Sequence, residues 1–156
     1  MTVRRPPVLE EGEDYRQIKY GLLHGLLTKD RFRLLQTVTF QTGIYGYSID
    51  TTYIRLDIEG RLTIRKNWEW DGASGPTLDS ARTMAASLVH DALYELIRKG
   101  FLPRKTESKA DLELYRILRA NQVNHLRAIS WLLAVDLFAG WWTGMDKTNK
   151  NKENTS

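Results

Sequence analysis

The chain has 156 residues, of which 42% are hydrophobic, and both values are typical of a single globular domain with its own core. It contains no cysteine, which excludes a disulfide framework and a thiolate metal site. The net charge is +4 and the basic residues are scattered along the sequence, so specific binding to nucleic acid is not indicated.

The two ends of the chain differ in composition from the rest. Residues 1–16 contain two adjacent prolines and a run of acidic residues, without the apolar segment of a signal peptide. We predict a flexible tail over residues 1–16, a single domain over residues 17–144 and a disordered polar tail over residues 145–156.

The first part of the domain has the pattern of β-structure. Residues 17–27 are ambiguous, because their apolar residues suit a short helix that two glycines weaken. From Arg33 to Ile64, β-branched and aromatic residues alternate with polar ones, and Glu59-Gly60 is a turn signal. This pattern predicts a small antiparallel sheet with apolar residues on one face.

After Lys66 the spacing of apolar residues becomes helical. One helix is predicted over residues 80–100 with Gly100 as its stop, a second follows Pro103, and a third spans about residues 125–142. Because the first connection is short, the first two helices should form an antiparallel pair. The expected fold class is α+β, a small N-terminal antiparallel sheet followed by three helices.

The third helix is nearly all apolar from Ala128 to Met145. It is short for a transmembrane segment, and Asp136 near its middle would cost about 3 kcal/mol in a bilayer. We therefore expect a buried helix that packs over the first two. Trp141 and Trp142, with the lysines after them, could still contact a membrane surface.

Groups able to do chemistry are concentrated between residues 71 and 111. His90 lies on an apolar face of the first helix, and Asp111 lies on an apolar face of the second. An unpaired buried carboxylate costs on the order of several kcal/mol, so we expect Asp111 to accept a hydrogen bond from His90. Such a pair is either a general base with its orienting acid or a structural pair in the core.

A second pair of acids is expected between the first helix and the loop that precedes it. Asp91 points about 100° away from His90 around the helix and could reach the loop over residues 70–76, which contains Asp71. Two carboxylates and exposed backbone carbonyls suit a hard cation such as Ca²⁺. The alternative is that Asp71 caps a turn and Asp91 pairs with a surface lysine.

These motifs resemble the phospholipase A2 superfamily, in which a calcium loop precedes a helix bearing HDxxY, here His90, Asp91 and Tyr94. The 21-residue interval from His90 to Asp111 resembles the compact bacterial and parvoviral branches. The resemblance implies that His90 is the base, that Asp111 orients it and that Tyr94 hydrogen-bonds Asp111; otherwise Tyr94 is a core aromatic residue. It also implies a calcium site, whose ligands we expect to be Asp91, Asp71 and the Gly72 carbonyl. The contacts with substrate are expected at Trp70 and Ser74.

The chain departs from that superfamily in having no cysteine and no multiple-glycine loop. From Tyr53 to Gly140 it also resembles an uncharacterised family common in bacteriophage genomes, through a D-x-A-S-x-P loop, a VHDxLY helix and an AD pair before the third helix. That resemblance implies a phage source and no particular activity. It places the protein in the host cytoplasm or the virion, where phage structural proteins are possible partners.

Together these features predict a phage-encoded, phospholipase A2-like hydrolase that uses calcium and acts on a lipid ester at a membrane surface. One alternative is a non-enzymatic phage accessory or virion protein, in which the His–Asp pair is structural. A second is an HD-type metal phosphohydrolase, which requires an upstream histidine that His24 would have to supply. Zinc catalysis would need more ligands than His90, Asp91 and the distant His125 offer.

Overall fold

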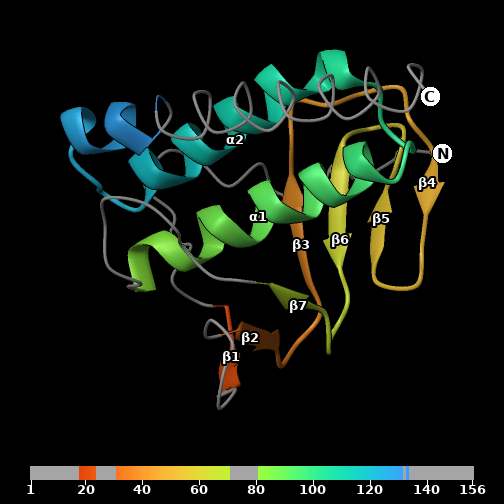
Figure 1. Ribbon diagram of the computed structural model, residues 1–156, viewed down its shortest axis with the longest axis horizontal. Coiled ribbons are helices and arrows are strands. Elements are labelled where there is room, and N and C mark those ends of the chain that lie inside the picture. The colour runs from red at the N-terminus through yellow and green to blue at the C-terminus, as the bar shows by residue number, and fades with distance from the viewer. Residues whose placement is uncertain (1–17, 24–30, 71–80, 132, 134–156) are drawn as a thin grey trace, which may run out of the picture.

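Strands precede helices in the computed structural model, which describes residues 18–23, 31–70, 81–131 and 133 (Figure 1). The predicted tails over residues 1–16 and 145–156 lie outside this part. The elements are, in order, β1 (Tyr20–Leu23), β2 (Arg31–Leu34), β3 (Val38–Gln41), β4 (Ile49–Asp50), β5 (Ile54–Leu56), β6 (Arg61–Ile64), β7 (Glu69–Trp70), α1 (Ala81–Arg98), the 3₁₀ turn η2 (Arg104–Thr106) and α2 (Glu107–Ala120). A third helix covers residues 125–131. The α+β class with a paired first and second helix is as expected.

The strands form two antiparallel sheets, whereas the sequence pattern predicted a single sheet. Sheet A has the order β1-β2-β7, and sheet B has the order β3-β6-β5-β4. Strand β1 corrects the short helix considered for residues 17–27, since Tyr20 pairs with Leu34 and Leu23 with Arg31. Strand pairing across the sheet supplies the hydrogen bonds that a short glycine-containing helix would have had to make alone.

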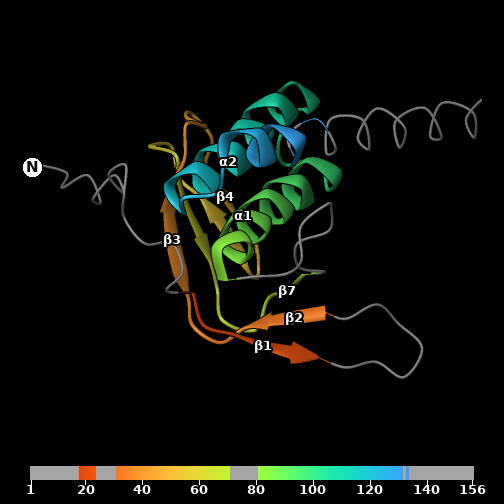
Figure 2. The same ribbon diagram turned by 90° about the vertical axis from the view of Figure 1, so that its left-hand side faces the viewer.

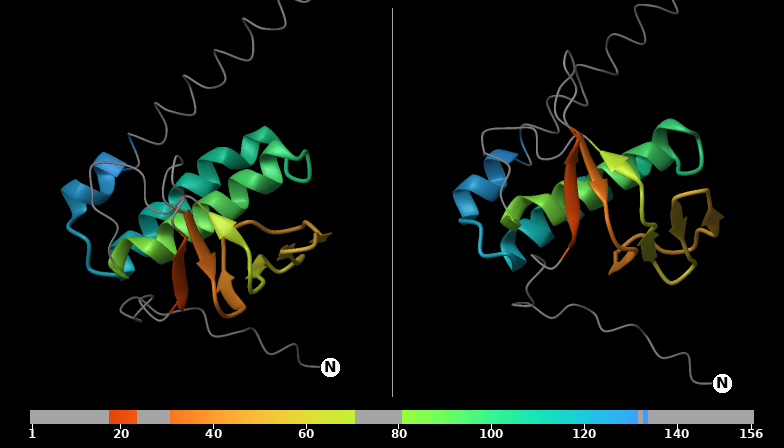
Figure 3. Two further views of the ribbon diagram at one scale, coloured as in Figure 1. Left: turned by 60° about the horizontal axis from the view of Figure 1, so that its bottom comes forward. Right: turned by 90° about the horizontal axis from the view of Figure 1, so that it is seen from below.

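The helices α1 and α2 lie side by side on one face of sheet B (Figures 1 and 2). Alternate residues of β5 and β6 face them and are fully buried, while the residues between are exposed or half-buried. Each such Leu or Ile contributes about 1.5–3 kcal/mol of burial free energy. Figure 3 shows β1, β2 and β7 side by side, with α1 passing over them.

The turn between β5 and β6 depends on Gly60, as the sequence predicted. Its φ is +81°, and a Cβ atom there would lie 2.8 Å from the Thr42 carbonyl oxygen. The Asp57 side chain accepts hydrogen bonds from the backbone N–H groups of Glu59 and Arg61. The Gly60 backbone and the Asp57 cap together set the register of β5 on β6.

Helix α1 ends where Gly100 was predicted to stop it. Gly100 has φ +80°, and the N–H groups of Phe101 and Leu102 bond back to the Leu96 carbonyl. The resulting tight connection returns the chain as α2. Of the predicted third helix, residues 125–131 are helical, and Ala128 and Trp131 are buried, as expected for a packing helix. Residues 134–142 lie outside the described part. Where the chain is described, no helix has both the length and the apolar character needed to cross a bilayer.

Helix α2 also covers the open edge of β3. The Glu113 carboxylate accepts a hydrogen bond of 2.8 Å from the Gly43 N–H, and Arg116 donates one of 2.7 Å to the Gln41 carbonyl. Glu113 and Arg116 also pair with each other at 2.7 Å. In a parallel sheet, one residue of the neighbouring strand would accept a hydrogen bond from the N–H of residue 43 and donate one to the carbonyl of residue 41. The side-chain pair thus replaces a strand at this edge and anchors α2.

Replacing Glu113 with alanine should therefore lower the free energy of unfolding by about 1–3 kcal/mol, because the Gly43 N–H loses its acceptor and Arg116 its partner. Chemical denaturation of the wild type and the Glu113→Ala variant measures this. Glu59→Ala is a matched control, since its side chain is 42% exposed and pairs with Arg61 two residues away, and it should cost less than about 1 kcal/mol. Equal losses in the two variants would show that Glu113 does not anchor α2.

Candidate functional site

His90, Asp111 and Tyr94 form a hydrogen-bonded cluster between α1 and α2. His90 Nε2 lies 2.8 Å from Asp111 Oδ1, and the Tyr94 hydroxyl donates to the same oxygen at 2.9 Å. The Asp111 side chain is 5% exposed and that of His90 is 11% exposed. The contacts predicted from sequence among these three residues are confirmed. Whether they are catalytic stays a prediction.

The helices position the cluster by their periodicity. His90 and Tyr94 are four residues apart on α1, and their rings lie 4.3 Å apart between centroids. The neighbouring residues on the His90 face, Ala86 and Leu93, are fully buried, so this face packs on α2. Asp111 lies on the facing side of α2, where a carboxylate without donors would be costly. Two donors from one helix turn satisfy it.

These contacts set the proton positions on the imidazole ring. An ionised carboxylate only accepts hydrogen bonds, so Asp111 accepts both the Tyr94 O–H and the His90 Nε2–H. In the neutral imidazole, Nδ1 then carries the lone pair. Nδ1 lies 3.8 Å from Asp91 Oδ1, too far for a direct hydrogen bond but within the span that one water molecule can bridge.

The surroundings of His90 act on its pKa in opposite directions. Burial is the largest single influence and lowers the pKa, since it penalises the charged ring. The hydrogen bond to Asp111 and the nearby charges of Asp91 and Asp111 raise it, and together they outweigh the burial. The pKa of His90 is therefore raised above its usual value of 6.5. The two carboxylates stabilise the imidazolium form, as a general base requires once it has taken a proton.

The predicted calcium ligands are described in part. Asp91 is on α1 with its side chain 36% exposed. Asp71 and Gly72 lie outside the described residues. Within the described ranges no three His, Cys, Asp or Glu residues are grouped so as to hold a metal ion. Calcium takes six to eight oxygen ligands, roughly, so the described side chains do not by themselves make a calcium site.

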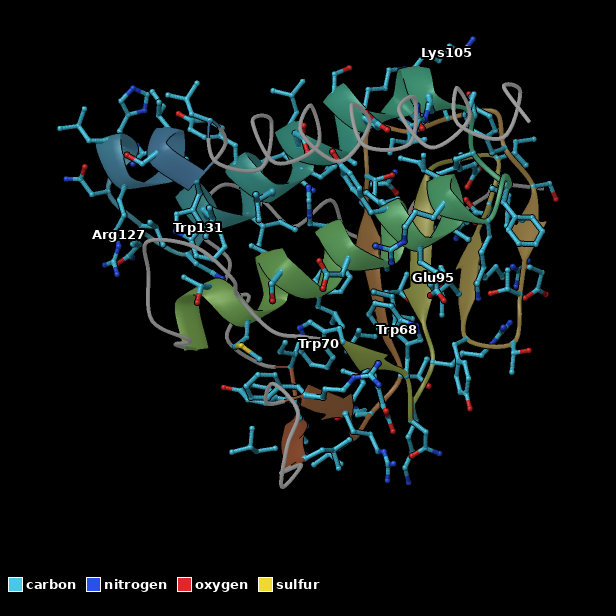
Figure 4. The ribbon with its side chains drawn as sticks, in the orientation of Figure 1. Trp68, Trp70, Glu95, Lys105, Arg127 and Trp131 are labelled. Carbon is cyan, nitrogen blue, oxygen red and sulfur yellow. The ribbon has the colours of Figure 1, made fainter. Side chains whose placement is uncertain are left out.

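Trp70 ends β7 and points toward α1, as Figure 4 shows. Its side chain is 2% exposed, and its indole N–H donates to Ser87 Oγ at 3.1 Å. Trp68 stacks on it and donates to Glu95 at 2.9 Å. The structure thus gives Trp70 a packing role that fixes α1 on sheet A, and its predicted contact with substrate is untested. Ser74 lies outside the described residues.

The links from Ser87 and Glu95 to the tryptophans were not anticipated from sequence. The sequence held only a general signal for these hydrogen bonds. A buried indole N–H needs an acceptor, and polar residues on α1 that face the two tryptophans could supply it. What the sequence does not contain is the strand-to-helix approach that decides which residues face each other.

A second histidine–tyrosine pair joins α2 to the third helix. His125 Nδ1 lies 2.7 Å from the Tyr115 hydroxyl, and His125 is exposed. No carboxylate of the described residues joins this pair. The described residues therefore give no support to a zinc site that combines His125 with His90. His24, which the phosphohydrolase alternative requires, lies outside the described residues.

No family model matches the chain, and no curated protein or solved structure does. The candidate site thus rests on its own geometry. That geometry is a buried carboxylate, a histidine oriented by it through Nε2, and a second ring nitrogen that faces another carboxylate.

Proposed function

We propose that this protein is a hydrolase of lipid esters in which His90 acts as the general base, and that it is encoded by a bacteriophage. One observation carries the catalytic part. Asp111 engages Nε2 of His90 and leaves Nδ1 as the basic nitrogen. The phage origin and the lipid class come from the motif resemblance around His90 and the loop before α1.

The proposed reaction begins with a water molecule held between His90 Nδ1 and Asp91. His90 removes a proton from this water while the oxygen attacks the ester carbonyl carbon. The tetrahedral intermediate then breaks its bond to the alcohol oxygen, and the imidazolium gives its proton to that leaving oxygen. The products are a carboxylic acid and an alcohol, and His90 returns to its neutral form.

Asp111 and Tyr94 have supporting roles in this mechanism. Asp111 keeps the Nε2–H tautomer and stabilises the imidazolium, and the Tyr94 hydroxyl holds the carboxylate in place. If calcium binds, Asp91 would be one ligand with the predicted Asp71 and Gly72, and the ion would polarise the ester carbonyl. The proton transfers described here need only His90 and its partners.

The test is hydrolysis of a phospholipid, a soluble short-chain ester and a phosphodiester by the full-length protein, each with calcium and with a calcium chelator. Release of fatty acid from the phospholipid supports the proposal, and calcium dependence would add the metal. Hydrolysis of the phosphodiester alone would favour a phosphohydrolase. Calorimetry with Ca²⁺ on the wild type, Asp91→Asn and Asp71→Asn tests metal binding separately.

The raised pKa of His90 predicts opposite pH dependences of activity and stability. The base must be neutral, so kcat/KM should rise with pH through a pKa above 6.5. Between 6.5 and that raised pKa the folded state binds more protons than the unfolded one. The His90 contribution to the free energy of unfolding is therefore full below 6.5 and is lost as the pH rises.

Denaturation of the wild type and His90→Gln from about pH 5.5 to about pH 9 measures this contribution as the difference between the two pH profiles. A difference that stays constant across this range would contradict the raised pKa. A kcat/KM profile that falls through the same window would contradict the role of neutral His90 as base.

A further inference from the structure

Helix α2 presents a charged stripe to solvent on the side away from the sheets. Relative to Leu112, its members lie at offsets of three and seven residues, so they share one face. We name this the α2 stripe, and its members are Lys105, Lys109, Leu112 and Arg119. Lys105 belongs to the preceding turn η2, and Figure 4 shows it pointing outward at the top of the molecule. Basic residues that are scattered in the sequence are gathered here by the helix.

The charge of this face is almost entirely positive. Lys105, Lys109 and Arg119 are exposed, while Arg116 is 39% exposed and paired with Glu113. The acids of α2 do not balance them, because Asp111 and Glu113 are buried. Glu107 is half-buried and faces Arg104 at 3.9 Å. Three exposed cations therefore follow one another, Lys105 in η2 and then Lys109 and Arg119 in the 14-residue helix α2, which is roughly 21 Å long.

An apolar side chain lies in the middle of these cations. Leu112 is 57% exposed, so burial in the core does not account for an apolar residue at this position. It follows Asp111 directly and so points about 100° away from it around the helix. The helix that supplies Asp111 to the candidate site thus carries the α2 stripe at the edge of that site.

We propose that the α2 stripe docks the protein on an anionic lipid surface, with Leu112 entering the boundary between headgroups and acyl chains. The lysines and Arg119 match the negative surface potential of such a layer. Leu112 distinguishes this partner from nucleic acid, because phosphate backbones attract cations but offer no apolar phase to an exposed leucine. The choice of lipid rests on the proposed function, and docking in this orientation would hold His90 and Asp111 beside the layer.

Cosedimentation with large vesicles of ether-linked phospholipids, which contain no ester bond to hydrolyse, tests the docking without turnover. The full-length protein should bind vesicles that contain phosphatidylglycerol, and should bind pure phosphatidylcholine vesicles much more weakly. A surface cation contributes about 1 kcal/mol, so Lys105→Gln/Lys109→Gln should lower the partition coefficient about 25-fold. Leu112→Gln should lower it about tenfold, from the loss of an inserted leucine. Binding of the wild type should weaken as salt is added.

A matched control removes the same charge elsewhere. Arg55 and Lys66 are exposed, and Arg55 lies between the two buried residues of β5, so it points to the face of sheet B away from the helices. Arg55→Gln/Lys66→Gln should change vesicle binding by less than about twofold. Circular dichroism of each variant verifies that the helices are intact.

The outcomes separate docking from catalysis. Equal losses in the two double variants, or no preference for anionic vesicles, would overturn the docking proposal. So would tight binding of an oligonucleotide that depends on Lys105 and Lys109 when the vesicles stay unbound. Hydrolysis of the soluble ester without vesicle binding would support the proposed function and overturn the docking proposal. Vesicle binding without hydrolysis of any ester would support the docking proposal and overturn the proposed function.

Discussion

His90→Gln should lower kcat for ester hydrolysis by about 10²–10⁴-fold, the usual contribution of a positioned general base. Glutamine can still donate a hydrogen bond to Asp111, so the contact between α1 and α2 is kept. It has no nitrogen that takes a proton from water. The loss should therefore appear in kcat, with the KM for the soluble ester changed by much less. Steady-state kinetics on this ester at a pH above the raised pKa of His90 provides the measurement.

The matched control for this prediction is His125→Gln. His125 is also hydrogen-bonded to a tyrosine, but it is exposed and lies beyond the end of α2. Its replacement should leave kcat within about twofold of the wild type. If His90→Gln and the wild type hydrolyse the ester at equal rates, His90 is not the base. The His90–Asp111 pair would then be structural, as the non-enzymatic alternative holds.

Asp111→Ala should lower the free energy of unfolding by about 3–5 kcal/mol, the largest single effect that we expect in this fold. The substitution leaves the His90 Nε2–H and the Tyr94 O–H without their common acceptor. Both donors lie between packed helices, where water replaces an acceptor poorly. Denaturant unfolding of the wild type and the variant at one pH gives the difference directly.

Tyr94→Phe is the graded comparison for this second prediction. It removes one of the two hydrogen bonds on Asp111 and keeps the aromatic ring, so it should cost about 0.5–1.5 kcal/mol. Asp111→Asn keeps the size of the side chain and should be less destabilising than Asp111→Ala. Its uncharged amide should nevertheless reduce kcat strongly, because it no longer stabilises the imidazolium. A loss below about 1 kcal/mol in Asp111→Ala would show that the cluster does not hold α1 against α2.

Stability and catalysis are expected to separate in these variants. His90→Gln affects mainly the rate, Asp111→Ala mainly the folded state, and Asp111→Asn the rate more than the folded state. If the His90–Asp111 pair is only structural, Asp111→Ala will lower the free energy of unfolding, but His90→Gln will not lower the rate. The comparison thus decides between the enzyme and the non-enzymatic alternative with the same set of proteins.

Much of the local structure could be read from the sequence. The alternation in β5 and β6, the turn at Gly60 and the stop at Gly100 are set by residues close together in the chain. The His90–Asp111 contact could also be inferred, because two polar groups on facing apolar stripes have few other ways to be satisfied. The spacing of the α2 stripe was equally present in the sequence, but its meaning depends on which face of α2 is buried.

By itself, then, the sequence determined the periodic elements, the short antiparallel connection and the pairing of His90 with Asp111. These follow from local repeats of two and 3.6 residues and from the cost of a buried charge. Tertiary structure decided the division into two sheets, the strand at Tyr20–Leu23 and the packing of Trp70 on Ser87. It also decided that Glu113 accepts a hydrogen bond from the N–H of Gly43, a residue 70 positions away. These contacts join distant segments, and which of them meet depends on how the whole core packs.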